Sequence, residues 1–549
     1  MTAAFPRRRA LWVAALVGLF AFRLLYGLCF EFFFEDETQI FLIGLRAYAG
    51  RTWPYFGPDV VWTKSQIPGA LQGLLVAVPM MVAPVPEAPF VLLNVLSMSA
   101  LAMLAWYIGK RLPTLPRWLV WGWLMTIPWT LNFSTSLINT SYVLPGAILF
   151  FVGFFEAHPR LSLGRVSSPL AHFMMGAAIG WVMQFHMSWP LLVPYAAIAL
   201  LARARDGWRS AGRAVGALGA GIALPGLLLL PTLLRFGLHA GAGGTGRNLQ
   251  VHLLGPGVLV TTTGRFLAFA SLEVIRFIGS DTPKRLVFIS RHPWIAPLFA
   301  LVWVVGIVHP LVMARLWFKR RHPARDDWPA LRALVVGTIA LVFIAFSFVM
   351  EPPQARSFYV VSPVAMMFAA YCWSFMDRPA WRRVAAVVLG VNIAYHLGLA
   401  LAKAPEGSLY MNRAVVAAAL TERDPDVFAH RREYAMDAIP AVDANARRDP
   451  RDEVVLLTPA WSIGAGRAIL WRVTVHNISS TRAYRDFLYY TNYRDASGRQ
   501  VLSRHGYIVD VVQPGESRAI EINDGAADVA FARATFEVVL AESLKPLRK

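Results

Sequence analysis

Long apolar stretches separated by short polar connections run through residues 1–403 of the chain. A stretch of about 20 apolar residues is long enough to cross the hydrocarbon core of a bilayer as a helix. About eleven such spans are predicted, and they lie at residues 10–30, 89–109, 117–132, 141–156, 170–187, 189–202, 214–234, 294–316, 331–350, 358–376 and 383–402. The pattern therefore predicts a polytopic α-helical membrane protein.

The segment 66–84 is apolar as well, but Pro68 and Pro79 interrupt it. We expect this segment to lie along the membrane surface as an interfacial helix rather than to cross. If it crossed, every later connection would change sides, and the arginine clusters would face outward.

Basic residues gather in alternate connections, and the positive-inside rule turns this bias into an orientation. With the N-terminus in the cytoplasm, the inward connections hold Lys110, Arg111, Arg117, Arg160, Arg165, Arg203, Arg205, Arg209, Arg213, Arg315, Lys319, Arg320, Arg321, Arg325, Arg378, Arg382 and Arg383. The outward side then receives a first loop at 31–88, a long loop at 235–293, which opens Gly-rich and is expected to be mobile, and everything after about residue 403.

The pattern changes after Lys403, where the membrane domain (1–403) gives way to a polar, Arg- and Asp-rich linker (404–453) that is expected to be helical. From Val454 onward, short alternating runs bounded by turns predict strands. The clearest runs are 470–475, 486–490, 507–512 and 536–540, with turns at 495–498 and 513–516. Residues 454–549 are therefore expected to form an Ig-like β-sandwich outside the cytoplasm.

Composition supports the membrane class. The chain has 549 residues, of which 56% are hydrophobic and only 16% are charged. A soluble protein of this size would need more charge to cover its surface. The net charge of +20 is dispersed between apolar spans, which favours a role in orientation and argues against a nucleic-acid partner.

Asp36 and Glu37 stand side by side just after the first span. Residues 37–49 have helical spacing, so the two acids would begin a helix along the outer membrane face. Carboxylates in a first turn are favoured by the helix dipole, and a solvated helix start is one interpretation of the pair. The other interpretation is a catalytic pair held at the bilayer edge, where ionised groups are costly unless they act.

The order of these segments carries a resemblance to a known family. An acid-bearing outer helix, the string Trp62-Thr63-Lys64-Ser65-Gln66 and a second interfacial helix resemble the first outer loop of membrane glycosyltransferases of the C superfamily. Protein O-mannosyltransferases and aminoarabinose transferases are the nearest in pattern. The resemblance implies a polyprenyl-phosphate sugar donor, with Asp36 as the general base for the acceptor hydroxyl and Glu37 as its neighbour.

Further positions match this family at outer boundaries. Gln184 and His186 follow the fifth span and would line the reaction cavity. The string that contains Arg356 and Tyr359 resembles the string that opens a late span in this family. The guanidinium of Arg356 could bind lipid phosphate there. Lys64 is a second phosphate candidate. For each of these positions the alternative is simple interfacial anchoring or hydrogen bonding.

Arg23 lies inside the first span. A mid-membrane arginine needs a partner, and the candidates are Glu37 or a lipid phosphate. The alternative is that Arg23 extends along the helix to reach the water.

Relatives often carry a second acid where this chain has Asn132, Asn139 and Thr140. Without that second acid, the sequence does not support a metal-dependent model. A divalent metal stays an open alternative, and no other cofactor is implied. The implied partners are a polyprenyl-phosphate-linked sugar, a glycan, lipid or protein acceptor, and membrane lipids. The implied location is a bacterial inner membrane, with the N-terminus cytoplasmic and the C-terminal domain periplasmic.

A lipid or glycan transporter or flippase is the alternative from another class, because it also needs outward polar cavities. Such folds usually show paired broken helices in corresponding halves, and no internal duplication is evident in this sequence. A scaffold that only anchors the β-domain would not need so many spans.

Overall fold

A computed structural model shows two compact units, Met1–Asn412 and Arg413–Lys549. The structure describes residues 4–30, 40–48, 53–60, 65–237, 251–404 and 453–544, apart from short gaps at 42, 46, 252–253, 279–281, 324, 350–352, 377, 465–466, 481, 509 and 528–529. The linker predicted at 404–453 and the Gly-rich opening of the long loop fall almost wholly outside the described residues.

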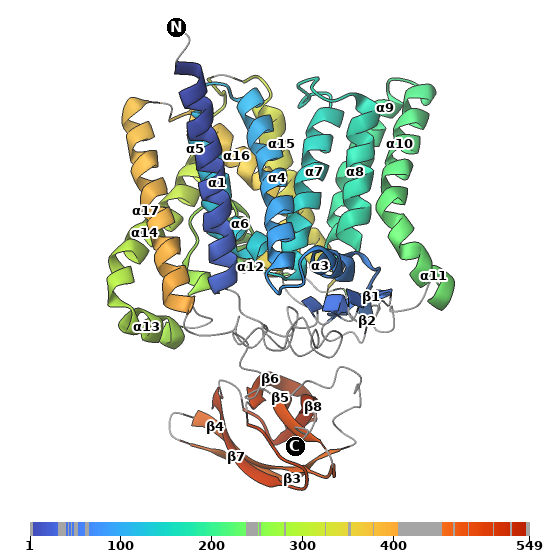
Figure 1. Cartoon of the computed structure of the whole chain (residues 1–549), viewed down its shortest axis with the longest axis vertical. Coiled ribbons are helices and arrows are strands. Elements are labelled where there is room, and N and C mark those ends of the chain that lie inside the picture. Colours follow the sequence, from blue (N-terminus) through green and yellow to red (C-terminus); the bar gives the residue numbers. More distant parts are fainter. Residues whose placement is uncertain are drawn as a thin grey trace. The chain divides into compact units, whose positions relative to one another are not determined.

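Every predicted span is occupied by helix in the first unit (Figure 1). In chain order the helices are α1 (Ala4–Phe30), α4 (Ala88–Arg111), α5 (Arg117–Thr126), α6 (Pro128–Thr135), α7 (Asn139–Ala157), α8 (Ser168–Met183), η1 (Trp189–Leu192) with α9 (Val193–Ala204), α10 (Trp208–Gly226) continuing through η2 (Leu227–Leu229) into α11 (Leu230–Phe236), η5 (Pro293–Ile295) with α14 (Ala296–Trp317), α15 (Trp328–Phe346), η6 (Ala355–Val361) with α16 (Ser362–Ser374), and α17 (Pro379–Lys403). The chain is a polytopic α-helical membrane protein.

Among the described residues, 8 of these helical stretches are long and apolar enough to cross a membrane. The other three predicted spans are helical but short or broken. The span predicted at 117–132 breaks at Ile127, which is extended (φ −65°, ψ 146°) because Pro128 follows it. The remaining two correspond to α8 and to η1 with α9.

Helices α8 and α10 pack closely through glycines. A Cβ atom on Gly176 would overlap the carbonyl oxygen of Leu218, and one on Gly221 would overlap that of Phe173. Small residues allow two membrane helices to approach through their backbones. The glycines therefore fix how α10 lies against the helix that leads into residues 184–188.

A Gly221→Ala substitution is expected to destabilise the protein by about 1–3 kcal/mol, because the added methyl must push the two backbones apart. Gly219→Ala on the same helix is the matched control, since nothing lies within 4 Å of its added Cβ. Unfolding of each variant in detergent micelles measures the difference. Equal stabilities of the two variants would contradict the close packing.

Smaller elements gather at the end of the bundle opposite the N-terminus (Figure 1). They include β1 (Phe56–Val60) and β2 (Ser65–Pro68), which pair antiparallel, and α3 (Leu71–Val82), α12 (Pro256–Ala268), η4 (Ile275–Phe277) and α13 (Thr282–Arg291). Helix α3 has 12 residues and lies within the segment expected not to cross. The described residues of the helix predicted at 37–49 are helical at 40–41, 43–45 and 47–48.

The second unit contains two antiparallel three-stranded sheets. One has the order β3-β4-β7 and the other β6-β5-β8. The strands are β3 (Val454–Ile463), β4 (Ala468–Asn477), β5 (Ala483–Arg494), β6 (Gln500–Ile508), β7 (Ser517–Ala526) and β8 (Arg533–Leu544). Because the two sheets share one hydrophobic core, the predicted β-sandwich is confirmed.

The inward faces of both sheets form one hydrophobic core, which includes Trp471, Val473, Phe487 and Tyr493. The Trp471 indole donates to the Tyr493 hydroxyl across the core at 2.8 Å. The predicted turn at 495–498 closes the β5–β6 hairpin, where Gly498 adopts φ 85° and donates to the Asp495 carbonyl at 3.0 Å.

Candidate functional site

The end of α8 leads into a polar turn that carries two predicted site residues. The turn ends where η1 begins, at Trp189, and Pro190 is the second residue of η1. Within the turn, His186 is half-buried and Ser188 is buried. The backbone N–H of Ser188 donates to Nδ1 of His186 at 3.1 Å, and the Ser188 hydroxyl lies 2.9 Å from the same nitrogen.

These contacts fix the tautomer of His186. A backbone N–H can only donate, so Nδ1 of His186 must accept and carries no proton. The neutral ring therefore holds its proton on Nε2, which makes no hydrogen bond within the part of the chain that the structure describes. This arrangement makes His186 a hydrogen-bond donor toward a ligand and unsuited to act as a base.

The charge state of His186 agrees with this tautomer. The residue lies past the end of α8, outside the membrane-spanning helices. Burial lowers the pKa of His186 to about 4, and the positive charge of Arg356 acts in the same direction. The folded protein disfavours the protonated ring. The free energy of unfolding therefore decreases as the pH falls from about 6.5 toward 4. Near neutral pH the ring is uncharged.

We expect His186→Gln to lower activity by a factor that is constant between about pH 5 and 8, because the wild-type ring does not titrate there. Glutamine keeps an amide donor and cannot ionise. The ratio of wild-type to variant turnover across this range is the measurement. A ratio that changes by more than about threefold around pH 6.5 would contradict a neutral His186.

Arg356 and Tyr359 lie on η6, which contacts η1. Arg356 is exposed at the end of the bundle opposite the N-terminus, whereas Tyr359 is buried. The Tyr359 hydroxyl donates to the carbonyl oxygen of Trp129 at 3.1 Å, and the two rings stack with centroids 5.8 Å apart. Tyr359 thus anchors η6 in the bundle and leaves Arg356 at its surface, where its charge reaches His186.

Gln184 is fully buried and directly follows the last residue of α8, at the start of the polar turn. Its amide Nε2 donates to the carbonyl oxygens of Gly180 and Pro225, at 3.2 and 2.8 Å. Its Oε1 has no hydrogen-bond partner among the described residues, and Gly69 packs directly against it, since a Cβ there would lie 2.6 Å from this oxygen. Gln184 therefore joins α8, α10 and the outer segment before α3.

Arg23 is fully buried, so the alternative that it extends to the water is wrong. Its Nη1 donates to the Met125 carbonyl at 2.7 Å, and Nε donates to Asn94 Oδ1 at 3.2 Å. Its Nη2 donates to Ser134 Oγ at 2.5 Å and to the Thr130 carbonyl at 3.4 Å. The guanidinium thus binds α1 to α4 and to the broken α5–α6 segment.

Sequence reasoning missed one carboxylate at this end of the bundle. Glu273, half-buried between α12 and η4, accepts a hydrogen bond at 2.9 Å from the indole Nε1 of Trp129. Trp129 is also the residue that binds Tyr359 through its carbonyl oxygen. A single acid within a long loop has no local spacing that would have marked it.

The remaining predicted site residues, Asp36, Glu37 and Lys64, lie outside the described residues. Among the residues that are described, no group of three His, Cys, Asp or Glu side chains is placed to hold a metal ion.

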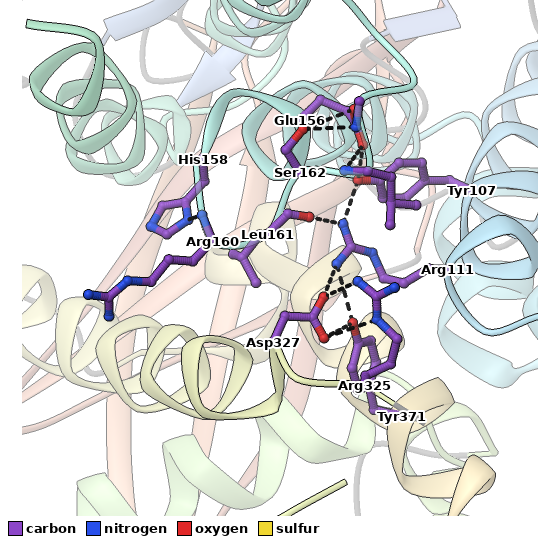
Figure 2. A network of polar contacts seen from close by, with 12 residues as sticks. Tyr107, Arg111, Glu156, His158, Arg160, Leu161, Ser162, Arg325, Asp327 and Tyr371 are labelled. Atoms are coloured by element: carbon purple, nitrogen blue, oxygen red, sulfur yellow. Dashed lines mark hydrogen bonds and ion pairs between the residues drawn. The ribbon is translucent and has the colours of Figure 1, made fainter. Parts of the chain in front are cut away.

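A second polar cluster lies where α4, α15 and α16 meet (Figure 2). The carboxylate of Asp327, just before α15, accepts from Arg111 Nη1 at 2.7 Å, from Arg325 Nη2 at 2.6 Å and from the Tyr371 hydroxyl at 2.9 Å. Burial alone would raise the pKa of Asp327, but the hydrogen bonds from Arg325 and Tyr371 and the charge of Arg111 outweigh it, and the pKa lies below its ordinary value.

The same cluster continues into the connection after α7. Arg111 Nη2 donates to the Tyr107 hydroxyl at 2.7 Å, which in turn donates to Glu156 Oε1 at 2.6 Å. Glu156 also accepts from the backbone N–H of Leu163 at 3.0 Å and of Arg165 at 2.7 Å. The connections predicted to share the cytoplasmic side are thereby tied together at one end of the bundle.

Comparisons with known proteins give little beyond this. No family model and no curated protein matches the sequence. Among solved structures, the chain is similar to arabinosyltransferase EmbB from Mycobacterium smegmatis, with a TM-score of 0.31 and 12% identity over 96% of this chain. The chain spans 64% of that protein's length.

The chain is also similar to the Pseudomonas fluorescens alkylpurine DNA glycosylase AlkC, with a TM-score of 0.17 and 10% identity. This likeness covers 82% of this chain and 98% of that one. Both scores are too low to carry an argument about function, which therefore depends on the site itself.

Proposed function

We propose that this chain is a membrane glycosyltransferase of the C superfamily in a bacterial inner membrane. It transfers a sugar, with inversion, from a polyprenyl-phosphate donor to an acceptor hydroxyl on the outer side, where the β-sandwich domain also lies. The N-terminus is cytoplasmic, because the basic connections are at that end. The supporting observation is that η1, which follows His186, contacts η6, which carries the exposed Arg356, although the two segments are far apart in the sequence.

The donor phosphate binds at this pair. Arg356 supplies an exposed guanidinium, which forms charge-assisted hydrogen bonds with phosphate oxygens. His186 supplies a neutral Nε2–H donor, so it can bind an oxygen without adding a second fixed charge. Lys64 adds a further cation from the first outer loop. Gln184 holds α8, which leads to His186, and Tyr359 holds η6, which carries Arg356. Arg23 holds α1 against α4 and the α5–α6 segment.

Asp36 is the general base in this proposal. Its carboxylate takes the proton of the acceptor hydroxyl while that oxygen attacks the anomeric carbon of the sugar. The bond between the anomeric carbon and the phosphate oxygen breaks, and its electron pair leaves with the lipid phosphate, whose charge Arg356 stabilises. Glu37 orients Asp36 or the acceptor.

A transfer assay tests the function. The full-length chain, reconstituted in proteoliposomes, is supplied with a panel of polyprenyl-phosphate sugars labelled in the sugar, and with a membrane extract as acceptor source. We expect one donor to lose its label to a new product while free polyprenyl phosphate accumulates. Movement of intact labelled donor across the bilayer without cleavage would instead indicate a lipid transporter and would contradict the proposal.

A further inference from the structure

A pocket of about 600 Å³ opens beside the Asp327 cluster, at the opposite end of the bundle from the proposed catalytic site. Its lining comes from the connection after α7 and from the start of α15. The lining residues are Arg160, Arg325, Asp326, Asp327, Pro329, Ala330 and Ala333. One part of the wall is therefore charged and the other part is apolar.

The charged side chains that line the pocket differ in whether they already have hydrogen-bond or ion-pair partners within the protein. Asp327 accepts hydrogen bonds from three side chains of the protein, so its carboxylate is already paired. Arg325 donates from Nε and Nη2 to Asp327 and also hydrogen-bonds to Tyr371. Arg160 and Asp326 are both exposed, and neither guanidinium nor carboxylate has a hydrogen-bond or ion-pair partner among the described residues. The pocket thus presents one unpaired cation and one unpaired anion.

The apolar wall continues along α15. Pro329 and Ala333 are exposed on this helix, and Val336 and Ile344 are exposed further along it. Because α15 is one of the helices long and apolar enough to span a membrane, this face meets lipid chains. A molecule that fills the pocket therefore has a charged head at the water boundary and an apolar tail against α15.

We propose that this pocket binds a phospholipid with an ethanolamine head group. The lipid phosphate accepts hydrogen bonds from Arg160, and the positive charge of Arg325 lies on the same wall. The primary ammonium group, which has three donors, binds the carboxylate of Asp326. An acyl chain lies along the exposed face of α15.

The paired charges favour this lipid over an anionic one. The phosphate of a purely anionic lipid would pair with the arginines but would leave Asp326 facing the same negative head group. A choline head group carries the same two charges but has no N–H donor for the carboxylate. Ethanolamine is the common head group that satisfies both sides of the pocket.

Native mass spectrometry of the full-length chain tests the assignment. The purified protein is delipidated, mixed with equimolar dioleoyl phosphatidylethanolamine, phosphatidylglycerol and phosphatidylcholine, and released from micelles to count the lipids that stay bound. We expect phosphatidylethanolamine to be retained about tenfold over either competitor, since charge-assisted hydrogen bonds contribute about one such factor each. Equal retention of the three lipids, or a preference for phosphatidylglycerol, would overturn the proposal.

Two variants separate the two ends of the head group. Arg160→Gln should lower retention of phosphatidylethanolamine about tenfold. Asp326→Asn should abolish its preference over phosphatidylglycerol while phosphatidylglycerol binding rises. Arg320→Gln is the matched control, because Arg320 is exposed on the same connection as Arg325 and does not line the pocket. An equal loss in Arg320→Gln would show general surface attraction and contradict a specific site.

All three replaced side chains are exposed, so the variants should fold like the wild type. As an independent readout, added phosphatidylethanolamine should raise the thermal unfolding midpoint of the wild type and of Arg320→Gln but not that of Arg160→Gln. A rise of the same size in all three proteins would also refute the assignment.

Discussion

Asparagine in place of Asp36 is expected to lower the rate of sugar transfer by about 10²- to 10⁴-fold, the usual contribution of a positioned general base. The amide has nearly the same shape as the carboxylate but cannot accept the proton of the acceptor hydroxyl. Donor binding should stay within about twofold of wild type, because the phosphate contacts come from other residues. Single-turnover transfer with a labelled donor measures the chemical step apart from product release.

Two controls accompany this variant. Asp36→Glu keeps a carboxylate at a shifted position and should recover part of the activity. Glu87→Gln, at the start of α4, removes an acid that has no role in the proposed site and should leave turnover unchanged. Full activity in Asp36→Asn would remove Asp36 as the base, and an equal loss in Glu87→Gln would point to a general effect of lost negative charge.

Replacing Asp327 by alanine is expected to destabilise the protein by about 3–5 kcal/mol. The Arg111 and Asp327 side chains are only 1% and 6% exposed, so the substitution leaves the Arg111 charge buried without its counterion. Unfolding by SDS titration in mixed micelles gives the difference. The double variant Arg111→Met with Asp327→Ala should recover part of the loss, because the fully buried Arg111 charge is then removed together with its counterion.

The exposed pair Arg203 and Asp206 is the matched comparison. Its nitrogen–oxygen distance is 3.0 Å, but the side chains are 25% and 52% exposed. Asp206→Ala should change stability by no more than about 1 kcal/mol. Similar losses in Asp206→Ala and Asp327→Ala would contradict the argument that burial makes the Arg111 pair important.

The Asp327 contribution also has a defined pH dependence. Its pKa is lowered in the folded protein, so its stabilisation is complete above the ordinary value of about 4. The stabilisation is lost as the pH falls further through the lowered value. The gap in stability between wild type and Asp327→Ala should therefore be constant near neutral pH and narrow only in acid.

The periodicity of the chain predicted much of the fold, because membrane spans and alternating strands are local patterns. Helices occupy each of the predicted spans, and β4, β5 and β8 contain three of the predicted runs. The run predicted at 507–512 overlaps β6 only at residues 507 and 508, because that strand begins earlier, at Gln500. The break at Ile127 was also readable, since Pro128 excludes helical geometry from the residue before it. The prediction of one continuous span at 117–132 gave too little weight to that proline.

Partners across the sequence were not predictable in the same way. For Arg23 the sequence left open a partner within the membrane or extension to the water, and the partners it has lie 71 to 111 residues away in the sequence. Arg111 was read only as an orientation signal, although it forms an ion pair with Asp327, 216 residues further on. Such contacts depend on which helices become neighbours, and hydropathy does not carry that information.

The candidate site likewise combines residues that the sequence suggested with contacts that it did not predict. The resemblance to C-superfamily glycosyltransferases suggested His186 and Arg356, and η1, which follows His186, contacts η6, which carries Arg356. The tautomer of His186 depends on the backbone N–H of Ser188, which follows from a turn geometry that the sequence does not specify. Asp36, Glu37 and Lys64 stay predictions that only experiment can test.

In the proposed function, Arg356 and His186 bind the phosphate of the lipid-linked donor. Equilibrium binding of radiolabelled polyprenyl phosphate to the full-length chain in nanodiscs tests it most directly, with Arg291→Gln as an exposed arginine control at the same end of the bundle. We predict that Arg356→Gln weakens binding about tenfold or more, while Arg291→Gln binds like the wild type. Unchanged affinity in Arg356→Gln would contradict the account.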